Sequence, residues 1–76
     1  MKHDHELDTR GLRCPEPVML LHACLRRAKA GEVIRLMADD PATQRDIPAL
    51  CSNLGHTLLD STESDGVWCY FVRKRD

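Results

Sequence analysis

The sequence predicts an α/β (α+β) two-layer sandwich, in which two helices pack on one face of a four-stranded mixed sheet in the order β-α-β-α-β-β. Two stretches carry apolar residues at three- and four-residue intervals, which is typical of amphipathic helices. Four shorter stretches bounded by turn-forming residues are typical of strands. A chain of 76 residues buries only about 60% of its surface on folding, so we expect one thin core and a single domain over residues 1–76.

The first half of the chain predicts a β-α-β unit. Residues 6–8 form a brief strand, and Gly11 marks a turn. A helix is predicted over 15–30, with Gly31 as the residue that ends it. Residues 33–38 are apolar and β-branched and predict a strand. The helix prediction depends on an apolar stripe formed by Val18, Leu21, Cys24, Leu25 and Ala28.

A second helix follows Pro41 and ends at Gly55. Its start has two possible positions, because proline is tolerated in a first turn but not deep inside a helix, and Pro48 lies nearby. Either Thr43 is the N-cap and the helix begins early, or Asp46 is the N-cap; we favour Thr43. The apolar stripe of this helix consists of Ile47, Leu50, Cys51 and Leu54.

Two final strands are predicted over 56–63 and 67–74, joined by a turn that contains Asp65-Gly66. The last two strands are then antiparallel, whereas the first two, linked by a helix, are parallel. Both helices must bury their apolar stripes, and one sheet face is enough to cover them.

The composition argues against nucleic-acid and membrane binding. The chain has 11 basic and 12 acidic residues and a formal charge of -1, which is not the charge of a polyanion binder. The short basic runs 26–27 and 73–75 are expected to be solvated. No apolar run approaches the length of a membrane span, and the start is acidic rather than apolar. We therefore expect a cytoplasmic monomer with a frayed segment 1–5, whose His-Asp-His is not a metal site.

Four cysteines stand alone in the sequence, at Cys14, Cys24, Cys51 and Cys69, without a Cys-x-x-Cys pair. Neither a structural zinc site nor a disulfide scaffold has this spacing, so free thiols are expected. Cys24 and Cys51 lie on the apolar stripes and are predicted to pack in the core. Cys69, between Trp68 and Tyr70, is expected to be packed or partly exposed.

Cys14 lies at the start of the first predicted helix. Pro15 and Pro17 are tolerated only near a helix N-terminus, which predicts Cys14 as the N-cap with the prolines at the first and third helical positions. A thiol is a poor cap, so its presence suggests chemistry, although a buried thiol in a turn is the alternative. The helix dipole, Arg10 and Arg13 should lower the thiol pKa. With both prolines lacking an N–H, the N–H of Glu16 is left as the main donor to the sulfur.

The sequence around Cys14 shows no partner for hydrolysis or disulfide chemistry. His22 is eight residues further along, about 12 Å up the helix, and His56 cannot be placed from sequence. No resolving cysteine lies within the motif. What remains is a single nucleophilic sulfur that can attack another sulfur and pass it on.

Two stretches in register, LDTRGLRCPEPVM at 7–19 and ADDPATQRDIP at 38–48, resemble the TusA family of small sulfur carriers over residues 7–74. The resemblance implies a fold similar to the C-terminal domain of translation initiation factor 3. It also implies that Cys14 receives a persulfide sulfur from a cysteine desulfurase and passes it to a downstream relay protein, ending in 2-thiouridine at the tRNA wobble position. Neither a cofactor nor substrate turnover by the carrier alone is implied.

The resemblance also implies roles for residues near Cys14. Pro15 and Pro17 shape the helix start. Glu16, Met19, Asp40 and Arg45 resemble the surface that docks the desulfurase, although a helix cap and a solvated charge are the alternatives for Asp40 and Arg45. Three other functions stay open: sulfur delivery to sulfur oxidation or cofactor sulfuration, a thiol redox module, and an RNA-binding domain suggested by fold analogy alone.

Overall fold

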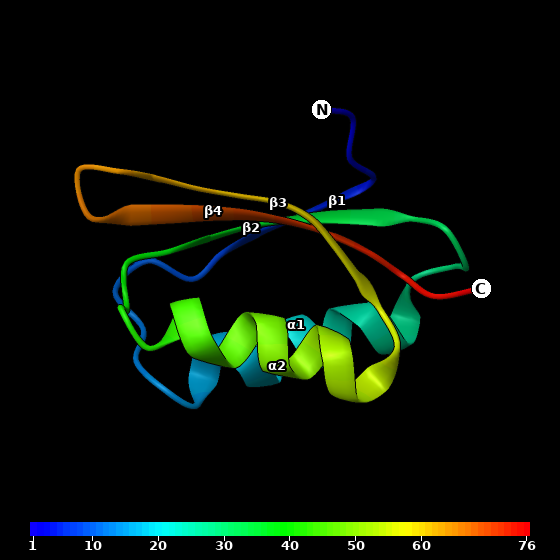
Figure 1. Ribbon diagram of the computed structural model, residues 1–76, viewed down its shortest axis with the longest axis horizontal. Coiled ribbons are helices and arrows are strands. Elements are labelled where there is room, and N and C mark those ends of the chain that lie inside the picture. The colour runs from blue at the N-terminus through cyan, green and yellow to red at the C-terminus, as the bar shows by residue number, and fades with distance from the viewer.

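The computed structural model describes residues 1–76 and contains six elements in the predicted order. Both helices lie on one side of the sheet, so the protein has two layers (Figure 1). The predicted fold class is therefore confirmed. No helix combines the length and the apolar composition that a bilayer span requires. The elements are β1 (His5–Asp8), α1 (Glu16–Arg27), β2 (Val33–Ala38), α2 (Thr43–Leu54), β3 (Thr57–Ser64) and β4 (Val67–Arg73).

The four strands form one mixed sheet in the order β1-β2-β4-β3. β1 and β2 are parallel, and β4 is antiparallel to both β2 and β3. The turn between β3 and β4 has positive φ angles at Asp65 (51°) and Gly66 (79°), as a tight hairpin turn requires. The mixed sheet and the closing hairpin are as predicted.

The core lies between the central strands and the two helices. Alternate side chains of the two central strands, β2 and β4, point toward the helices, and most of them are fully buried because the helices cover this face. Helices α1 and α2 contribute the opposite wall of this core. The fully buried apolar side chains include Leu21, Leu25, Ile34, Leu36, Ile47, Tyr70 and Val72.

Helix α1 is shorter than predicted and ends at Arg27 rather than at residue 30. Ala28 takes an extended conformation (φ -70°, ψ 154°) and is buried. The chain then makes a turn in which the Glu32 carboxylate accepts the N–H of Lys29 at 2.8 Å. Gly31 has a positive φ of 82° within this turn and does not end the helix. Helix α1 thus ends about one turn before Gly31, where Ala28 enters the core in an extended conformation.

Helix α2 begins early, as favoured from the sequence, but Ala42 rather than Thr43 is its N-cap. Thr43 is the first helical residue, and its hydroxyl donates to the Asp40 carbonyl at 2.8 Å and lies 2.9 Å from the Tyr70 hydroxyl. Pro48 lies inside the helix. Gly55 ends the helix with a positive φ of 78°, as predicted.

The C-terminal basic run is not simply solvated, as the sequence had suggested. The Lys74 ammonium donates to the carbonyl of Leu25 near the end of α1, and the Arg75 guanidinium donates to the carbonyl of Leu54 at the end of α2 (3.2 Å). These carbonyls lack intrahelical partners and carry the negative end of the helix dipole. The tail therefore caps both helices.

Asp4 and His5, within the segment 1–5 that is expected to be frayed, contact the start of β2. The N–H of Asp4 donates to the Val33 carbonyl at 2.8 Å. His5 begins β1, and its Nε2 lies 2.8 Å from a Glu32 carboxylate oxygen. The contacts join Asp4 and His5 to Glu32 and Val33, where β2 begins.

Candidate functional site

The loops that follow β1 and β2 lie side by side, because parallel strands end at the same edge of a sheet. The Asp39 carboxylate accepts the N–H of Gly11 at 2.9 Å and the Arg13 guanidinium at 2.8 Å. The Asp40 carboxylate accepts the N–H of Cys14 at 2.7 Å. The two family-like stretches thus meet in space, and the second fixes the backbone of the first.

Cys14 immediately precedes the N-cap of α1 and is not the N-cap itself. Pro15 occupies the cap position, Pro17 is the second helical residue, and the Cys14–Pro15 peptide bond is cis. The prediction that the Glu16 N–H would donate to the sulfur is wrong. That N–H donates instead to the Arg13 carbonyl at 2.9 Å, because a turn through Cys14 and Pro15 precedes the helix.

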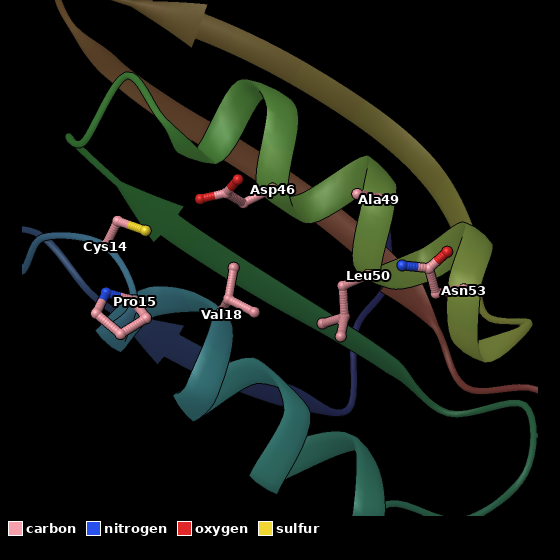
Figure 2. A pocket seen from close by; sticks show the side chains of 7 residues that line it. All are labelled: Cys14, Pro15, Val18, Asp46, Ala49, Leu50 and Asn53. Atoms are coloured by element: carbon pink, nitrogen blue, oxygen red, sulfur yellow. The ribbon is translucent and has the colours of Figure 1, made fainter.

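The thiol of Cys14 is exposed and stands at an open groove between α1 and α2 (Figure 2). This inter-helix groove has a volume of about 330 Å³. Its walls are mainly apolar. Figure 2 shows the side chains of Cys14, from the turn before α1, and Asp46, from the first turn of α2, pointing toward each other. The lining residues are Cys14, Pro15, Val18, Asp46, Ala49, Leu50 and Asn53.

The pKa of the Cys14 thiol is raised, which corrects the predicted lowering. The Asp46 carboxylate, which faces the thiol and favours its protonated form, is the main cause, followed by partial desolvation and by the negative charge of Asp40. The arginines expected to lower the pKa are engaged elsewhere. Arg10 makes a two-pronged pair with Asp8 at 2.9 and 2.8 Å, and Arg13 pairs with Asp39. Carboxylates that are distant in sequence, Asp46 and Asp40, thus raise the pKa of Cys14 despite the arginines close to it in sequence.

Asp40 is a structural residue of the site rather than an exposed docking residue. Its exposed fraction is 6%, and its second carboxylate oxygen accepts the N–H of Ala42 at 3.1 Å. The two N–H donors, from Ala42 and Cys14, lower the pKa of Asp40. Asp40 thus joins the turn at Cys14 to Ala42, the N-cap of α2, and is not the cap itself.

The other residues expected to dock a partner lie on the surface. Glu16 is exposed in the first turn of α1. Met19 is 61% exposed and Leu20 is 42% exposed on the same helix. The Arg45 side chain is 80% exposed and pairs with the neighbouring Asp46 at 3.2 Å. Met19 and Leu20 are thus two adjacent exposed apolar residues on α1.

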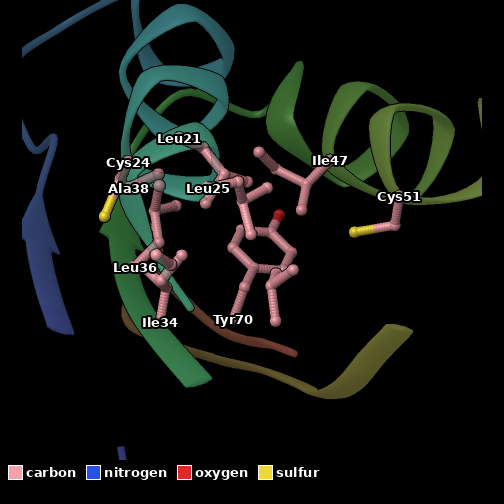
Figure 3. Packing of buried hydrophobic residues seen from close by; sticks show 11 residues of the cluster. Leu21, Cys24, Leu25, Ile34, Leu36, Ala38, Ile47, Cys51 and Tyr70 are labelled. Carbon is pink, nitrogen blue, oxygen red and sulfur yellow. The ribbon is translucent and has the colours of Figure 1, made fainter. Parts of the chain in front are cut away.

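The remaining cysteines are placed as the sequence predicted. Figure 3 shows Cys24 and Cys51 within the buried cluster, where they are 8% and 3% exposed. Burial raises the pKa of Cys51 to about 11. Cys69 is half-buried on β4, next to the inward-facing Tyr70, and so lies on the sheet face away from the helices. None of the three lines the groove with Cys14.

No histidine can serve as a base for Cys14 in this arrangement. His56 directly follows the C-terminal end of α2, where its Nδ1 accepts the N–H of Arg75 at 3.1 Å. The thiol instead stands beside the first turn of α2, so the length of the helix separates the two. Burial and the positive charges of Arg75 and Lys74 lower the pKa of His56. The site is a single sulfur beside a carboxylate.

Comparison with known proteins identifies the family. The family model described as Sulfurtransferase TusA matches residues 5–74. The chain belongs to the TusA family. Among its relatives, the sulfur carrier protein TusA of Pseudomonas entomophila strain L48 is 51% identical over 73 residues, which cover 96% of this chain and 91% of the relative. The corresponding protein of Pseudomonas putida strain W619 is 49% identical over 72 residues, which cover 95% and 90%.

A solved structure supports the fold. The SirA-like protein of Desulfitobacterium hafniense superposes with a TM-score of 0.83 at 21% identity, covering 96% of this chain and 100% of that one. At this identity, the likeness concerns the fold alone. It shows that the two-layer arrangement of this TusA-family chain also occurs in a distantly related sequence.

Sequence reasoning missed the role of Asp46 in this TusA-family site. Asp46 was considered only as a helix cap or first-turn residue, and the groove residues Ala49 and Asn53 were not considered at all. One signal was available: helices that follow two parallel strands begin at the same edge of the sheet, so their first turns are neighbours. This placement predicts that an acid in the first turn of α2 lies near Cys14.

Proposed function

We propose that this chain is a sulfur carrier that takes up a sulfane sulfur as a persulfide on Cys14. The sulfur would come from a cysteine desulfurase and pass to a downstream relay protein, toward 2-thiolation of the tRNA wobble uridine. Family membership supports sulfur carriage. The single observation that carries the assignment to Cys14 is that, of four free cysteines, only Cys14 is exposed.

The shape of the site suits a carrier that works through its partners. The groove is open and shallow, so it cannot enclose a small substrate, and no base beyond Asp46 stands beside the sulfur. The chemistry must then be completed on the surface of another protein. Glu16, Met19 and Arg45 are exposed around the thiol and form the proposed docking surface. The buried Asp40 carboxylate accepts the Cys14 N–H and so fixes the backbone that carries the thiol.

The competing functions have less support in the structure. A thiol redox module needs a second cysteine within reach of Cys14, but Cys24 and Cys51 are buried in the core and Cys69 lies on the sheet face away from the helices. An RNA-binding surface needs a large group of free basic side chains. Arg10, Arg13 and Arg73 are paired with acids, and Arg26 and Arg27 form only a short exposed run in a chain of formal charge -1. Delivery to sulfur oxidation or cofactor sulfuration would use the same site and differs only in the acceptor.

Mass spectrometry after incubation with a cysteine desulfurase and cysteine tests the proposal. The Cys14 peptide should gain one sulfur, and a thiol reductant should remove it. Reversal is essential, because a sulfinic acid has nearly the same mass and does not revert. Cys69→Ser should load like the parent chain, whereas Cys14→Ser should not load. Loading of Cys14→Ser at the parental level would contradict the assignment.

A further inference from the structure

Asp46 is the one ionisable side chain that shares the inter-helix groove with Cys14. Its side chain is only 21% exposed, and Figure 2 shows its carboxylate directed across the groove toward the sulfur. The first turn of α2 holds it there, with Ile47 buried in the core on the next position. An acid in the first turn of α2 suits the helix dipole wherever its side chain points, so the dipole does not account for its direction toward the sulfur.

We propose that Asp46 holds the thiol proton of Cys14 in the groove and accepts that proton when the sulfur attacks a donor persulfide. This proposal rests on the proposed sulfur-carrier function and adds a proton acceptor to it. In the free carrier the sulfur is then kept as a thiol, which is a poor nucleophile and resists oxidation. The thiolate forms only as the new sulfur–sulfur bond forms.

The other charged groups near Cys14 cannot take this role. Both oxygens of Asp40 already accept backbone N–H groups, from Cys14 and Ala42. Arg13, from the loop before α1, is paired with Asp39. Arg45 carries a permanent positive charge and cannot accept a proton; its exposed guanidinium donates to Asp46 Oδ1 at 3.2 Å, which engages only one of the two carboxylate oxygens of Asp46. Asp46 alone has a carboxylate that faces the sulfur without being committed to the backbone, and it is the first cause of the raised pKa of Cys14.

The loading step balances with Asp46 as the proton carrier. The Cys14 sulfur attacks the outer sulfur of the donor persulfide, R–S–SH, while the thiol proton moves to the Asp46 carboxylate. The new S–S bond forms on Cys14 as the donor S–S bond breaks, and the donor leaves as the thiolate R–S⁻. Asp46 then returns the proton to give R–SH. Cys14 is oxidised to the persulfide level, the donor is reduced to a thiol, and no external oxidant is needed.

Two rates separate the effect of Asp46 on the thiolate population from its effect on transfer. Alkylation by iodoacetamide depends on the thiolate fraction of Cys14 and expels iodide without a proton. Single-turnover loading from glutathione persulfide also requires the proton transfers described above. Both rates are measured from pH 6 to 10 on the full chain and on Asp46→Asn. Asp60→Asn is the matched control, because Asp60 pairs with Phe71 on the sheet face away from the helices.

Asp46→Asn should be alkylated several-fold faster than the parent chain at pH 7, with its pH midpoint shifted down. Its loading rate divided by its alkylation rate should fall on the order of tenfold, as expected when a proton acceptor is lost. Asp46→Glu should restore part of both effects, and Asp60→Asn should match the parent chain.

An unchanged alkylation profile in Asp46→Asn, or an unchanged ratio while the parent chain loads normally, would overturn the Asp46 proposal alone. Failure of the parent chain to load any sulfur, despite normal alkylation of Cys14, would instead contradict the proposed function. Circular dichroism of each variant checks that the rates are measured on folded protein.

Discussion

Two carboxylates beside Cys14 have different roles because they face different atoms. Asp40 accepts the Cys14 N–H and holds the backbone of the turn, whereas Asp46 faces the sulfur and controls its proton. Neither role is visible from the local sequence Arg-Cys-Pro-Glu-Pro, because both acids come from the loop and helix that follow β2. The reactivity of this cysteine is therefore set mainly by long-range contacts.

Asp40 should make the stability of the protein sensitive to acid. Its pKa is lower in the folded state than in the unfolded chain, so its stabilising effect is complete above the ordinary carboxyl pKa of about 4 and disappears as the pH falls through the lowered value. Urea unfolding of Asp40→Asn should show a larger stability deficit, relative to the parent chain, at pH 7 than at about pH 3. An equal deficit at both pH values would argue against this role.

The four thiols should differ sharply in reactivity in the native protein. Cys14 should be alkylated first, because it alone is exposed, and the half-buried Cys69 should follow more slowly. Cys24 and Cys51 should react only after denaturant is added, because they are buried and the pKa of Cys51 is about 11. Peptide mapping after timed iodoacetamide treatment at pH 8 gives the order. Native-state labelling of Cys51 as fast as that of Cys14 would contradict the structure.

At the scale of secondary structure, periodicity and turn residues predicted every element but not every boundary. The stripes of α1 and α2, the Asp65-Gly66 turn and the stop at Gly55 were all visible in the sequence. The end of α1 was misplaced, because burial of Ala28 in the core is a tertiary effect. The N-cap of α1 was misplaced by one residue for a similar reason: Asp40 fixes the turn before it.

Capping of the two helices by the C-terminal tail should be measurable. Lys74→Met removes the donor to the Leu25 carbonyl and should lower the free energy of unfolding by about 1 kcal/mol. The loss should shrink at high salt, because the charge interaction with the helix end is partly screened. Lys2→Met, at the exposed N-terminus, is the matched control and should unfold like the parent chain. A solvated tail, as first expected, would make both variants neutral.

At the scale of the whole molecule, the thin two-layer fold determines where chemistry can occur. One layer of helices over one sheet leaves no enclosed cavity, and the groove between α1 and α2 opens at the edge where the parallel strands end. The fold, the mixed sheet and the reactive cysteine could be predicted from patterns within single segments. The groove and the Cys14–Asp46 pair could not, because they depend on how α1 and α2 are placed relative to each other.

A single thin core should leave little tolerance for cavities. Leu25 is completely buried between α1 and the sheet, and Leu25→Ala should cost about 3 kcal/mol of the free energy of unfolding. A domain of this size has only about 5 kcal/mol or somewhat more in total, so this variant should be partly unfolded at 37 °C. Leu25→Met, which nearly preserves volume, should lose less than about 1.5 kcal/mol. Equal effects of the two substitutions by circular dichroism would argue against this core.

The central claim, that Cys14 is the sulfur-bearing residue, is tested most directly by following one labelled sulfur on to the protein and off it. Radiolabelled cysteine and a cysteine desulfurase supply the sulfur, and a small-molecule thiol is added afterwards as the acceptor. We predict that the parent chain and Cys69→Ser become labelled and then release the label to the acceptor thiol, whereas Cys14→Ser is never labelled. Labelling of Cys14→Ser, or retention of the label by the parent chain, would contradict the account.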